Sequence, residues 1–154
     1  MISQTTEYAL RAVVSLGYRP TAPMTTQQIA EMTQVPVNYL SKVLQLLVRA
    51  GILSSQRGIN GGFTLVKRPA DLTLWDVVNA TEPIRRIECC PLAIPGHAHG
   101  LCALHKRLDQ VIALIEQKYR ETTIAQLLND PDAAPPLCDW PRGLESARPP
   151  QVQP

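Results

Sequence analysis

Aromatic side chains are scarce in this sequence of 154 residues: they make up 5% of the chain, and Phe63 is its single phenylalanine. No apolar run approaches the length of about 18 residues at which a membrane-spanning helix is expected. No signal peptide is expected either, because the first apolar run is short and interrupted by Arg11 and Ser15. These absences argue against a membrane protein and a secreted disulfide scaffold, and they predict one domain in the reducing cytoplasm.

Neither sign of charge is in strong excess, since 15 Lys and Arg against 13 Asp and Glu leave a net charge of +2. The distribution is uneven: residues 1–80 carry seven basic and four acidic residues, whereas residues 81–154 carry eight and nine. A mildly basic first half is compatible with a nucleic-acid partner. Proline is also uneven, with seven of 14 in the last 26 residues, so residues 130–154 are predicted to be a disordered tail.

Apolar spacing in the first half predicts three helices followed by a hairpin. The helices are expected over residues 5–18, 26–32 and 37–50, and the strands over residues 52–57 and 63–66, on either side of GINGG. Within GINGG, Asn60-Gly61 indicates a hairpin because both residues tolerate positive φ. Three helices and a hairpin are the order of a winged helix-turn-helix, so residues 1–80 are predicted to form a DNA-binding domain of a mainly α protein.

The second half is predicted to contain a short helix and a long one. Thr73 and Asp76 form a capping box for the short helix, which is expected to end near Ala80. The long helix is indicated by apolar residues three or four positions apart, namely Leu101, Leu104, Leu108, Val111, Ile115 and Tyr119. Because such a narrow seam suits packing against a second subunit, residues 101–129 are expected to form the dimerisation segment of a homodimer, after a separate loop at residues 81–100.

The polar side of the third helix is the main argument for binding double-stranded DNA. Polar and amide side chains early in such a helix reach base edges in the major groove, and Lys or Arg neutralises phosphates. Hydroxyls at the start of the preceding helix favour a phosphate, and wing glycines allow a close approach to DNA. A winged helix can instead dock a protein. The predicted DNA-contacting residues are Thr25, Thr26, Gln27, Asn38, Tyr39, Ser41, Lys42, Gln45, Arg57, Asn60, Gly61 and Gly62.

Three stretches carry a resemblance to a known family: TTEYALRAVV, IAEMTQVPVNYLSKVLQLLVRAGIL and RGINGGFTLVKRPADLTLWDVVNATE. Over about residues 1–128 the chain resembles the Rrf-two (Rrf2) family of bacterial regulators, which includes IscR, NsrR and CymR. The resemblance implies a homodimeric DNA-binding transcription factor, usually a repressor. Ser41 departs from the Glu that follows the Tyr-Leu pair in IscR-like members, so the operator sequence does not carry over. No enzymatic activity is expected, because no nucleophile–base pair, carboxylate dyad or phosphate loop is recognisable.

Three of the four cysteines and all three histidines lie within 17 residues, in the segment IECCPLAIPGHAHGLCALHKRL. Cys102 and His105 are three positions apart at the start of the long helix, so both can point to one face. Cys90 lies in the preceding loop, where a metal could join the loop to the helix. By itself this crowding indicates a metal or redox site and leaves its cofactor open.

The family resemblance implies a more definite ligand set. Cluster-binding members have Cys-x5-Cys-x5-Cys in this segment; Cys90 and Cys102 match the outer positions, whereas Gly96 replaces the middle cysteine beside His97. The resemblance also implies a ligand at His105 and an acid from the partner's first helix, at the position of Glu7.

The candidate metal ligands are therefore Cys90, Cys102, His105, His97 and Glu7. Mixed Cys and His ligands hold [2Fe–2S] clusters in Rieske proteins and equally hold tetrahedral zinc. An iron–sulfur cluster, [2Fe–2S] in type, is favoured, with zinc or no metal as alternatives. The function expected from this set is a repressor whose DNA affinity responds to redox state or nitric oxide at the site. The alternative is a cofactor-free regulator controlled by a protein partner or a small molecule.

Overall fold

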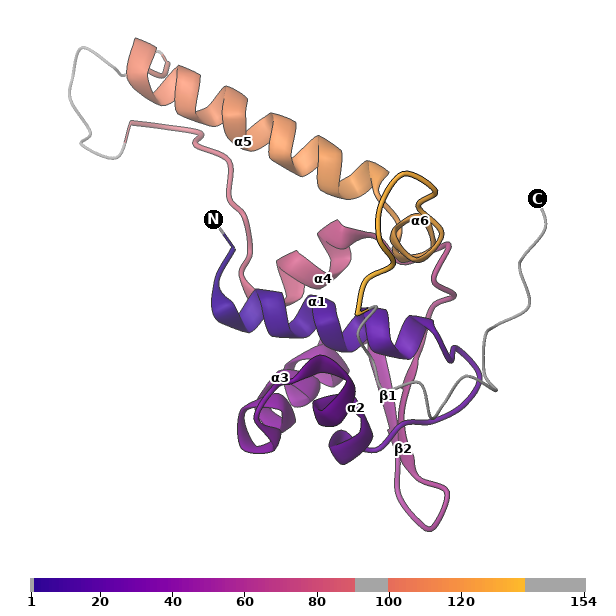
Figure 1. Cartoon of the computed structure of the whole chain (residues 1–154). Coiled ribbons are helices and arrows are strands. Elements are labelled where there is room, and N and C mark those ends of the chain that lie inside the picture. The colour runs from indigo at the N-terminus through magenta and orange to yellow at the C-terminus, as the bar shows by residue number, and fades with distance from the viewer. Residues whose placement is uncertain (1, 91–99, 138–154) are drawn as a thin grey trace.

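The computed structural model describes residues 2–90 and 100–137, and its elements follow one another in the predicted order (Figure 1). The elements are α1 (Gln4–Gly17), α2 (Thr26–Thr33), α3 (Val37–Arg49), β1 (Leu53–Gln56), β2 (Gly62–Leu65), α4 (Leu74–Thr81), α5 (Ala103–Glu121) and α6 (Ile124–Leu128). Three helices followed by a two-stranded antiparallel hairpin confirm the predicted mainly α, winged helix-turn-helix fold.

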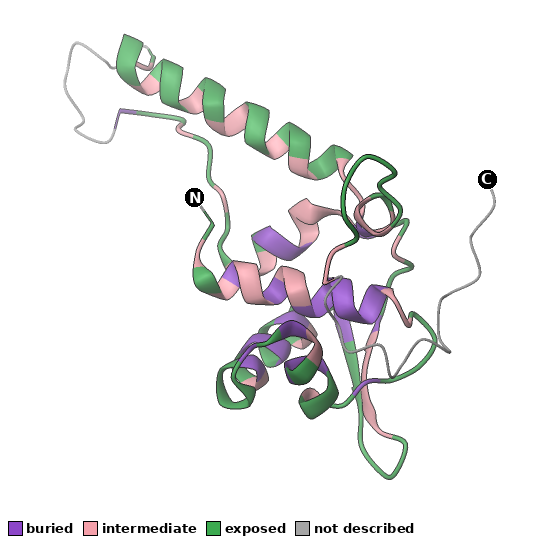
Figure 2. Ribbon diagram, viewed as in Figure 1, coloured by how far each residue is buried: buried purple, intermediate pink, exposed green. Residues whose placement is uncertain are grey.

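Helix α1 is the central element of the core and contacts α2, α3, α4 and α6. Its Ala12 and Leu16 are inaccessible to solvent, as are Leu40, Leu44 and Leu47 on the inner side of α3. Each fully buried leucine contributes about 1.5–3 kcal/mol of transfer free energy. Buried residues are concentrated where α1 passes over α3 and the hairpin (Figure 2). This packing fixes the orientation of α3, so its other side faces solvent as one surface.

The hairpin is longer than a tight turn requires. The strands pair from Leu53 opposite Leu65 to Gln56 opposite Gly62, which leaves the five residues 57–61 as the connecting loop. On its other side, β2 forms an antiparallel bridge between Phe63 and Met24, and this bridge joins the wing to the segment that precedes α2. The wing is therefore anchored to the helix-turn-helix through β2, and its loop projects beyond this bridge.

The hairpin predicted around GINGG is confirmed, although its loop does not use Asn60-Gly61 as a two-residue turn. Positive φ occurs at Gly58 (113°) and Gly62 (156°), and Asn60 does not adopt it. A five-residue loop distributes the reversal over more residues, so it does not need positive φ at Asn60. Gly61 is required for a different reason, because a Cβ atom there would lie 2.4 Å from the carbonyl oxygen of Gln56.

Helices α4 and α6 each begin with a capping box. Thr73 and Asp76 form the predicted capping box of α4, with hydrogen bonds of 3.2 Å in both directions. Helix α6 was not predicted as a separate element. It begins after Thr123, which forms its own capping box with Gln126, and its Ile124 is completely buried. This Thr-x-x-Gln spacing is the sequence signal that could have revealed α6.

The first part of the predicted tail, residues 130–137, contains turns, and Pro136 accepts a 2.7 Å hydrogen bond from the Tyr18 hydroxyl at the end of α1. The rest of the tail lies outside the described residues. Across the described ranges, no helix is long and apolar enough to cross a membrane.

Candidate nucleic-acid interface and cysteine–histidine site

The helix-turn-helix is formed by α2 and α3. Thr25 caps α2: its hydroxyl accepts the Gln28 N–H at 3.3 Å, and the Gln28 side chain accepts the Thr25 N–H at 2.9 Å. Gln34 then adopts the left-handed conformation, with φ of 56°, and reverses the chain. Pro36 precedes α3 and its carbonyl accepts the Leu40 N–H at 2.9 Å. The angle between the two helices is thus set by local hydrogen bonds as well as by the core.

The solvent face of α3 carries most of the predicted contact residues. Asn38, Lys42 and Gln45 are exposed, as expected for side chains that reach DNA. Ser41 is only partly exposed. Its hydroxyl donates to the Val37 carbonyl at 2.9 Å, within the same helix, and not to a partner outside it. The face therefore presents amides and a cation.

Tyr39 lies on α3 but contacts α1. Its hydroxyl is 2.8 Å from Thr5 Oγ1, and its ring meets the Tyr8 ring edge-on, with the ring centroids 5.4 Å apart. Edge-to-face pairs of this kind are worth about 0.5–1.5 kcal/mol beyond the area they bury. Tyr39 therefore joins α3 to α1 in the isolated chain, a role that its sequence position does not reveal.

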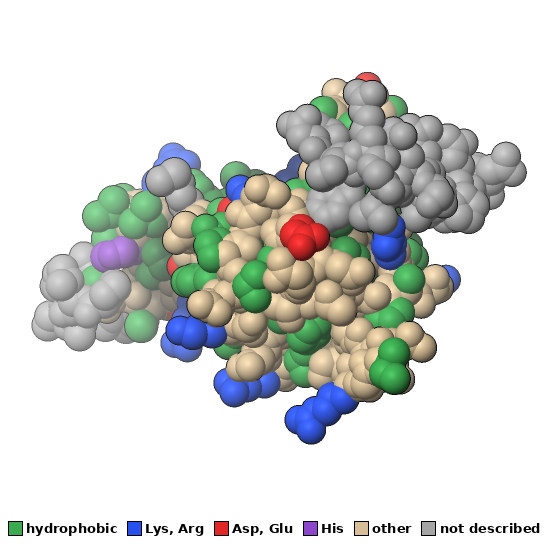
Figure 3. Space-filling view, turned by 60° about the horizontal axis from the view of Figure 1, so that its bottom comes forward, with side chains coloured by type: hydrophobic (Ala, Val, Ile, Leu, Met, Phe, Trp, Pro, Cys, Tyr) green, Lys and Arg blue, Asp and Glu red, His purple; other side chains and the backbone are tan. Residues whose placement is uncertain are grey.

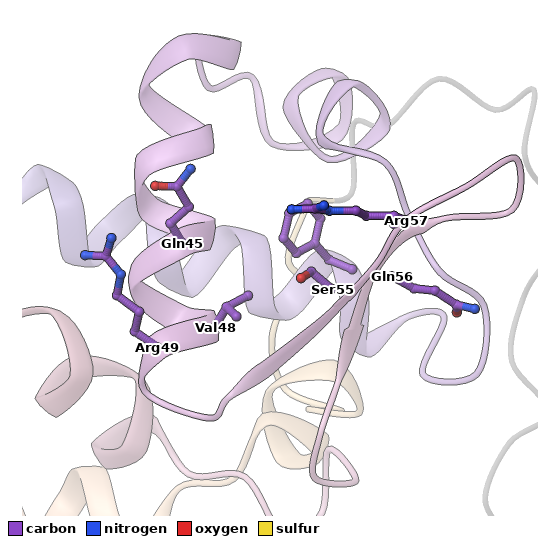
Figure 4. A pocket seen from close by; sticks show the side chains of 8 residues that line it. Gln45, Val48, Arg49, Ser55, Gln56 and Arg57 are labelled. Atoms are coloured by element: carbon purple, nitrogen blue, oxygen red, sulfur yellow. The ribbon is translucent and has the colours of Figure 1, made fainter.

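A cleft of ≈ 430 Å³ separates the second half of α3 from the wing. Gln45 and Arg49 line it on the α3 side, and Arg57 extends from the hairpin toward α3, whereas the Gln56 side chain points to the opposite side (Figure 4). Phe63 forms part of its lining. Arg49 lies on the same polar side of α3 as the predicted contact residues and adds a cation to this side of the cleft.

Positive charge dominates this face. Residues 32–70 contain five Lys and Arg and no Asp or Glu. Lys67 and Arg68 form ion pairs with Asp76 and Asp71. Within the described part of the chain, the other three basic residues of the stretch form no ion pair; they are Lys42, Arg49 and Arg57. Seen from this side, Lys and Arg side chains project along the lower edge, and acidic side chains show mainly at one small spot (Figure 3).

The wing's predicted contact residues lie in the hairpin loop and at its junction with β2, where Arg57 and Asn60 are exposed and Gly61 and Gly62 are partly exposed. On α2, Thr26 is partly exposed and follows the Thr25 cap. Gln27 is exposed and donates to Glu31 Oε1 at 3.0 Å. The structure thus brings the start of α2, the outer side of α3 and the wing to the same side of the molecule (Figure 1).

The cysteine–histidine site lies at the other end of the molecule, at the start of α5. Cys102 is the N-cap residue of α5, and its Sγ is 3.3 Å from His105 Nδ1. The prediction that these two side chains point to one face is confirmed.

The segment that leads to Cys90 is bound to α5 by the partly exposed carboxylate of Asp109. Asp109 accepts two hydrogen bonds from the Arg86 guanidinium, at 2.7 and 2.6 Å, and a third from the Ile87 N–H at 2.9 Å. The Asp109 side chain is 16% exposed. The Arg86 guanidinium, helped by the Ile87 N–H, lowers the pKa of Asp109 to about 2. This contact, which we call the Asp109 clamp, holds the segment of residues 82–90 against α5 at Arg86 and Ile87, and beyond this point the segment runs alongside α5 (Figure 1).

The Asp109 clamp also brings Cys90 to the level of Cys102. Cys90 is three residues beyond Ile87, a reach of about 10 Å for extended chain. Cys102 precedes Asp109 by seven residues, or about 10 Å of helix rise in the same direction. Cys90 is itself buried. Two thiols and one imidazole are therefore brought to the same end of α5.

The remaining candidate ligands are not part of this group in one chain. Glu7 lies on α1, where its carboxylate accepts from Arg11 Nε at 2.9 Å. His97 lies outside the described residues. Among residues 2–90 and 100–137, no group of three or more His, Cys, Asp and Glu side chains is already placed to hold a metal. The described part of the chain therefore offers one pair of donors in contact, Cys102 and His105, with Cys90 toward the same end of α5.

The three-helix core, the wing beside it and the positively charged, acid-free face of α3 define a winged helix-turn-helix DNA-binding protein. The chain matches the family model of Rrf2, described as an iron-dependent transcriptional regulator, over residues 2–130. It therefore belongs to the Rrf2 family of DNA-binding transcriptional regulators, which are not enzymes.

Relatives and solved structures agree with this assignment. A protein of Aquifex aeolicus that carries the name of an HTH-type transcriptional regulator is 29% identical over 132 residues, which cover 84% of this chain and 92% of that protein. The structure is similar to CymR (YrzC), the global cysteine regulator of B. subtilis, with a TM-score of 0.70, 23% identity and coverage of 82% and 95% of the two chains. It is equally similar to T. potens IscR, with a TM-score of 0.70, 23% identity and coverage of 84% and 87%. These two structures show a shared fold.

Proposed function

We propose that the protein is a homodimeric cytoplasmic repressor whose affinity for double-stranded DNA depends on a metal or iron–sulfur site at the start of α5. The observation that carries the sensing part is the 3.3 Å approach of Cys102 Sγ and His105 Nδ1, beside a segment that brings Cys90 to the same level. The DNA-binding part is supported by the face formed by α3 and the wing.

The docking that fits this face places α3 in the major groove. Asn38 and Gln45 then face base edges, to which amide side chains can form paired hydrogen bonds. A sugar–phosphate strand runs over the cleft between α3 and the wing, where Arg57 extends from the wing and Arg49 lines the α3 side. Each phosphate that Lys or Arg neutralises releases counterions, so the affinity should fall steeply with salt.

The homodimer is supported by the apolar side of α5. This helix has 19 residues, none of them buried in the single chain, and it lies apart from the core (Figure 2). A contiguous apolar stripe of this size needs a partner, and an identical helix would cover it symmetrically. The exposed apolar residues are Leu104, Leu108, Val111, Leu114 and Ile115. Two recognition helices in one dimer would also double the number of phosphate contacts.

The donor set fits an iron–sulfur cluster or zinc, because thiolate and imidazole are ligands that both accept. Cys90, Cys102 and His105 would hold the group, with His97 from the intervening loop and Glu7 from the partner subunit as the further candidates. A bound cluster would supply a centre that oxidants, nitric oxide or iron loss can alter. The protein's own part is to hold the two thiols and the imidazole at one end of α5.

The site is connected to the DNA-binding domain at both ends of α5. At the C-terminal end, the Leu74 N–H of α4 donates to the Thr122 carbonyl at 2.9 Å, and the Arg120 guanidinium lies 4.3 Å from the centre of the Trp75 ring. At the other end, the segment of residues 82–90 connects α5 to α1. Its first residue, Glu82, accepts the Ser3 N–H at the start of α1. A change in ligation that shifts α5 or this segment would therefore shift α4 and α1.

Anaerobic purification of the full chain tests the proposal, with visible absorbance and analysis of iron, sulfide and zinc. We expect iron and sulfide in wild type and in Cys89→Ala, whose exposed thiol is the matched control, and neither in Cys90→Ala/Cys102→Ala. Zinc without sulfide would support a metal site and reject the cluster. A wild-type protein without any metal would reject both.

Binding to duplex DNA from the chain's own promoter region, measured before and after exposure to oxidant or nitric oxide, tests the coupling. We expect the affinity of wild type to change and that of the double variant to stay constant, while both show salt-dependent binding. A double variant that responds as wild type does would reject the sensor.

A further inference from the structure

The wing tip carries an apolar side chain, Ile59, that is fully exposed to solvent in the described part of the chain. Ile59 has a relative exposure of 105%, the highest among the exposed large apolar residues of the described chain. It occupies the centre of a loop, a position where polar and small residues predominate. Its neighbours in the loop are Arg57, Gly58, Asn60 and Gly61.

The loop that presents Ile59 is narrow and closed on itself. The Gly61 N–H donates to the Gly58 carbonyl at 2.9 Å, and Gly61 packs so closely on the Gln56 carbonyl that no Cβ would fit. Because positions 58, 61 and 62 are glycines, only Ile59 and Asn60 project side chains at the tip. The tip is therefore a thin wedge with one apolar and one amide side chain.

The wedge projects on the side of the molecule that α3 faces (Figure 1). The Arg57 side chain at its base extends toward α3 across the cleft (Figure 4). When α3 occupies a major groove, a hairpin in this position reaches across the sugar–phosphate strand to the adjacent minor groove. That groove is about 6 Å wide, so it admits a thin tip with few side chains.

We propose that Ile59 lies against the floor of the minor groove and selects A·T or T·A over G·C at that base pair. In the minor groove, G·C differs from A·T by the N2 amino group of guanine, which is a hydrogen-bond donor. An isoleucine packed over this amino group would remove it from water and offer no acceptor, which is unfavourable. Apolar side chains of this kind are used at minor-groove contacts in other DNA-binding proteins. The inference rests on the proposed docking of α3 and the wing.

In vitro selection from a random duplex pool tests the inference with three proteins: wild type, Ile59→Ser and Val66→Ser. Val66 is the matched control, because it is an apolar residue that is 58% exposed just beyond β2. We expect wild type and Val66→Ser to select A·T pairs at two symmetric positions outside the α3 contacts. We expect Ile59→Ser to select the same inner bases without that outer preference. Because Ile59 is fully exposed, Ile59→Ser should keep the wild-type circular dichroism spectrum and melting temperature.

Inosine in the selected duplex then identifies the groove that is read. Replacing the outer A·T pair by G·C should weaken wild-type binding about tenfold. Replacing it by inosine·cytosine, which keeps the major-groove face of G·C but lacks the N2 amino group, should restore binding to within about twofold of the A·T duplex. In Ile59→Ser the G·C penalty should fall to about twofold or less.

Two results would overturn the inference while leaving DNA binding intact. One is an inosine·cytosine duplex that binds wild type as weakly as the G·C duplex does. The other is an Ile59→Ser protein that keeps the full G·C penalty. A wild-type protein that selects no duplex at all would overturn the proposed docking together with the inference.

Discussion

At the scale of single residues, Lys42 is the cation best placed to report on DNA docking. It is exposed on the outer side of α3, and no carboxylate of the described chain forms an ion pair with it. We expect Lys42→Ala to weaken binding to all duplexes alike and to reduce the slope of log affinity against log salt by about 1 per protomer. Lys118→Ala, in the last turn of α5, is the control and should leave the slope unchanged. Fluorescence anisotropy at several salt concentrations measures both; equal slopes in wild type and Lys42→Ala would contradict the docking.

Also at this scale, Asp109 links pH to the position of the segment that contains Cys90. Its pKa is lowered to about 2, so the Asp109 clamp should stabilise the fold fully above the ordinary carboxyl pKa of about 3.9 and lose this contribution as the pH falls through about 2. Asp109→Asn should remove the contribution at every pH. Hydrogen exchange of residues 82–90 should therefore be faster in Asp109→Asn than in wild type at pH 5, and the two should converge near pH 2.

Asp71→Asn is the matched control for the Asp109 clamp. Asp71 pairs with Arg68 three positions away, and the Arg68 side chain is 81% exposed. Solvent screens such a pair, so its loss should leave the exchange of residues 82–90 unchanged. If Asp109→Asn and Asp71→Asn behave alike, the Asp109 clamp does not hold the segment against α5.

At the scale of elements, the short α6 contributes to stability through one side chain. Ile124 is completely buried and is the only buried residue of α6. We expect Ile124→Ala to lower the free energy of unfolding by about 2–4 kcal/mol, because it removes buried methyl groups and leaves a cavity under α1. Val66→Ala, at an exposed position, should change it by less than about 0.5 kcal/mol. Urea unfolding followed by circular dichroism measures both, and equal midpoints would show that α6 is not part of the core.

The elements differ in how far the sequence predicts them, and the difference follows the range of the interactions. The order of the helices and the α4 capping box depend on local spacing, so they could be predicted. The contact of Cys102 with His105 is also local, since residues three apart share a helix face. The Asp109 clamp joins residues 23 apart, and Tyr39 meets Thr5 across 34 residues. No local pattern encodes such pairs. The hairpin could also be predicted, but the conformation of its loop could not, because Asn60-Gly61 sets positive φ only where the loop has two residues.

At the scale of the whole molecule, the proposed dimer is what would turn one weak DNA-binding surface into an effective one. Leu108 and Val111 are 47% and 54% exposed in the single chain, so their replacement should not disturb its core. We expect Leu108→Glu/Val111→Glu to be monomeric in sedimentation equilibrium, because charges would be buried against an apolar partner helix. Its affinity for a palindromic duplex should fall about tenfold or more, since each monomer neutralises only half the phosphates.

The control for the dimer is Gln110→Glu, which adds a charge at an exposed position of the same helix outside the apolar stripe. It should remain dimeric and bind DNA as wild type does. A wild-type protein that sediments as a monomer at micromolar concentration would reject the dimer, and the apolar side of α5 would then need another partner. A dimer in both variants would place the interface elsewhere. The double variant could be monomeric and still bind a single half-site as wild type does. In that case dimerisation raises the affinity by joining two half-sites, and the DNA-binding domain folds without the dimer.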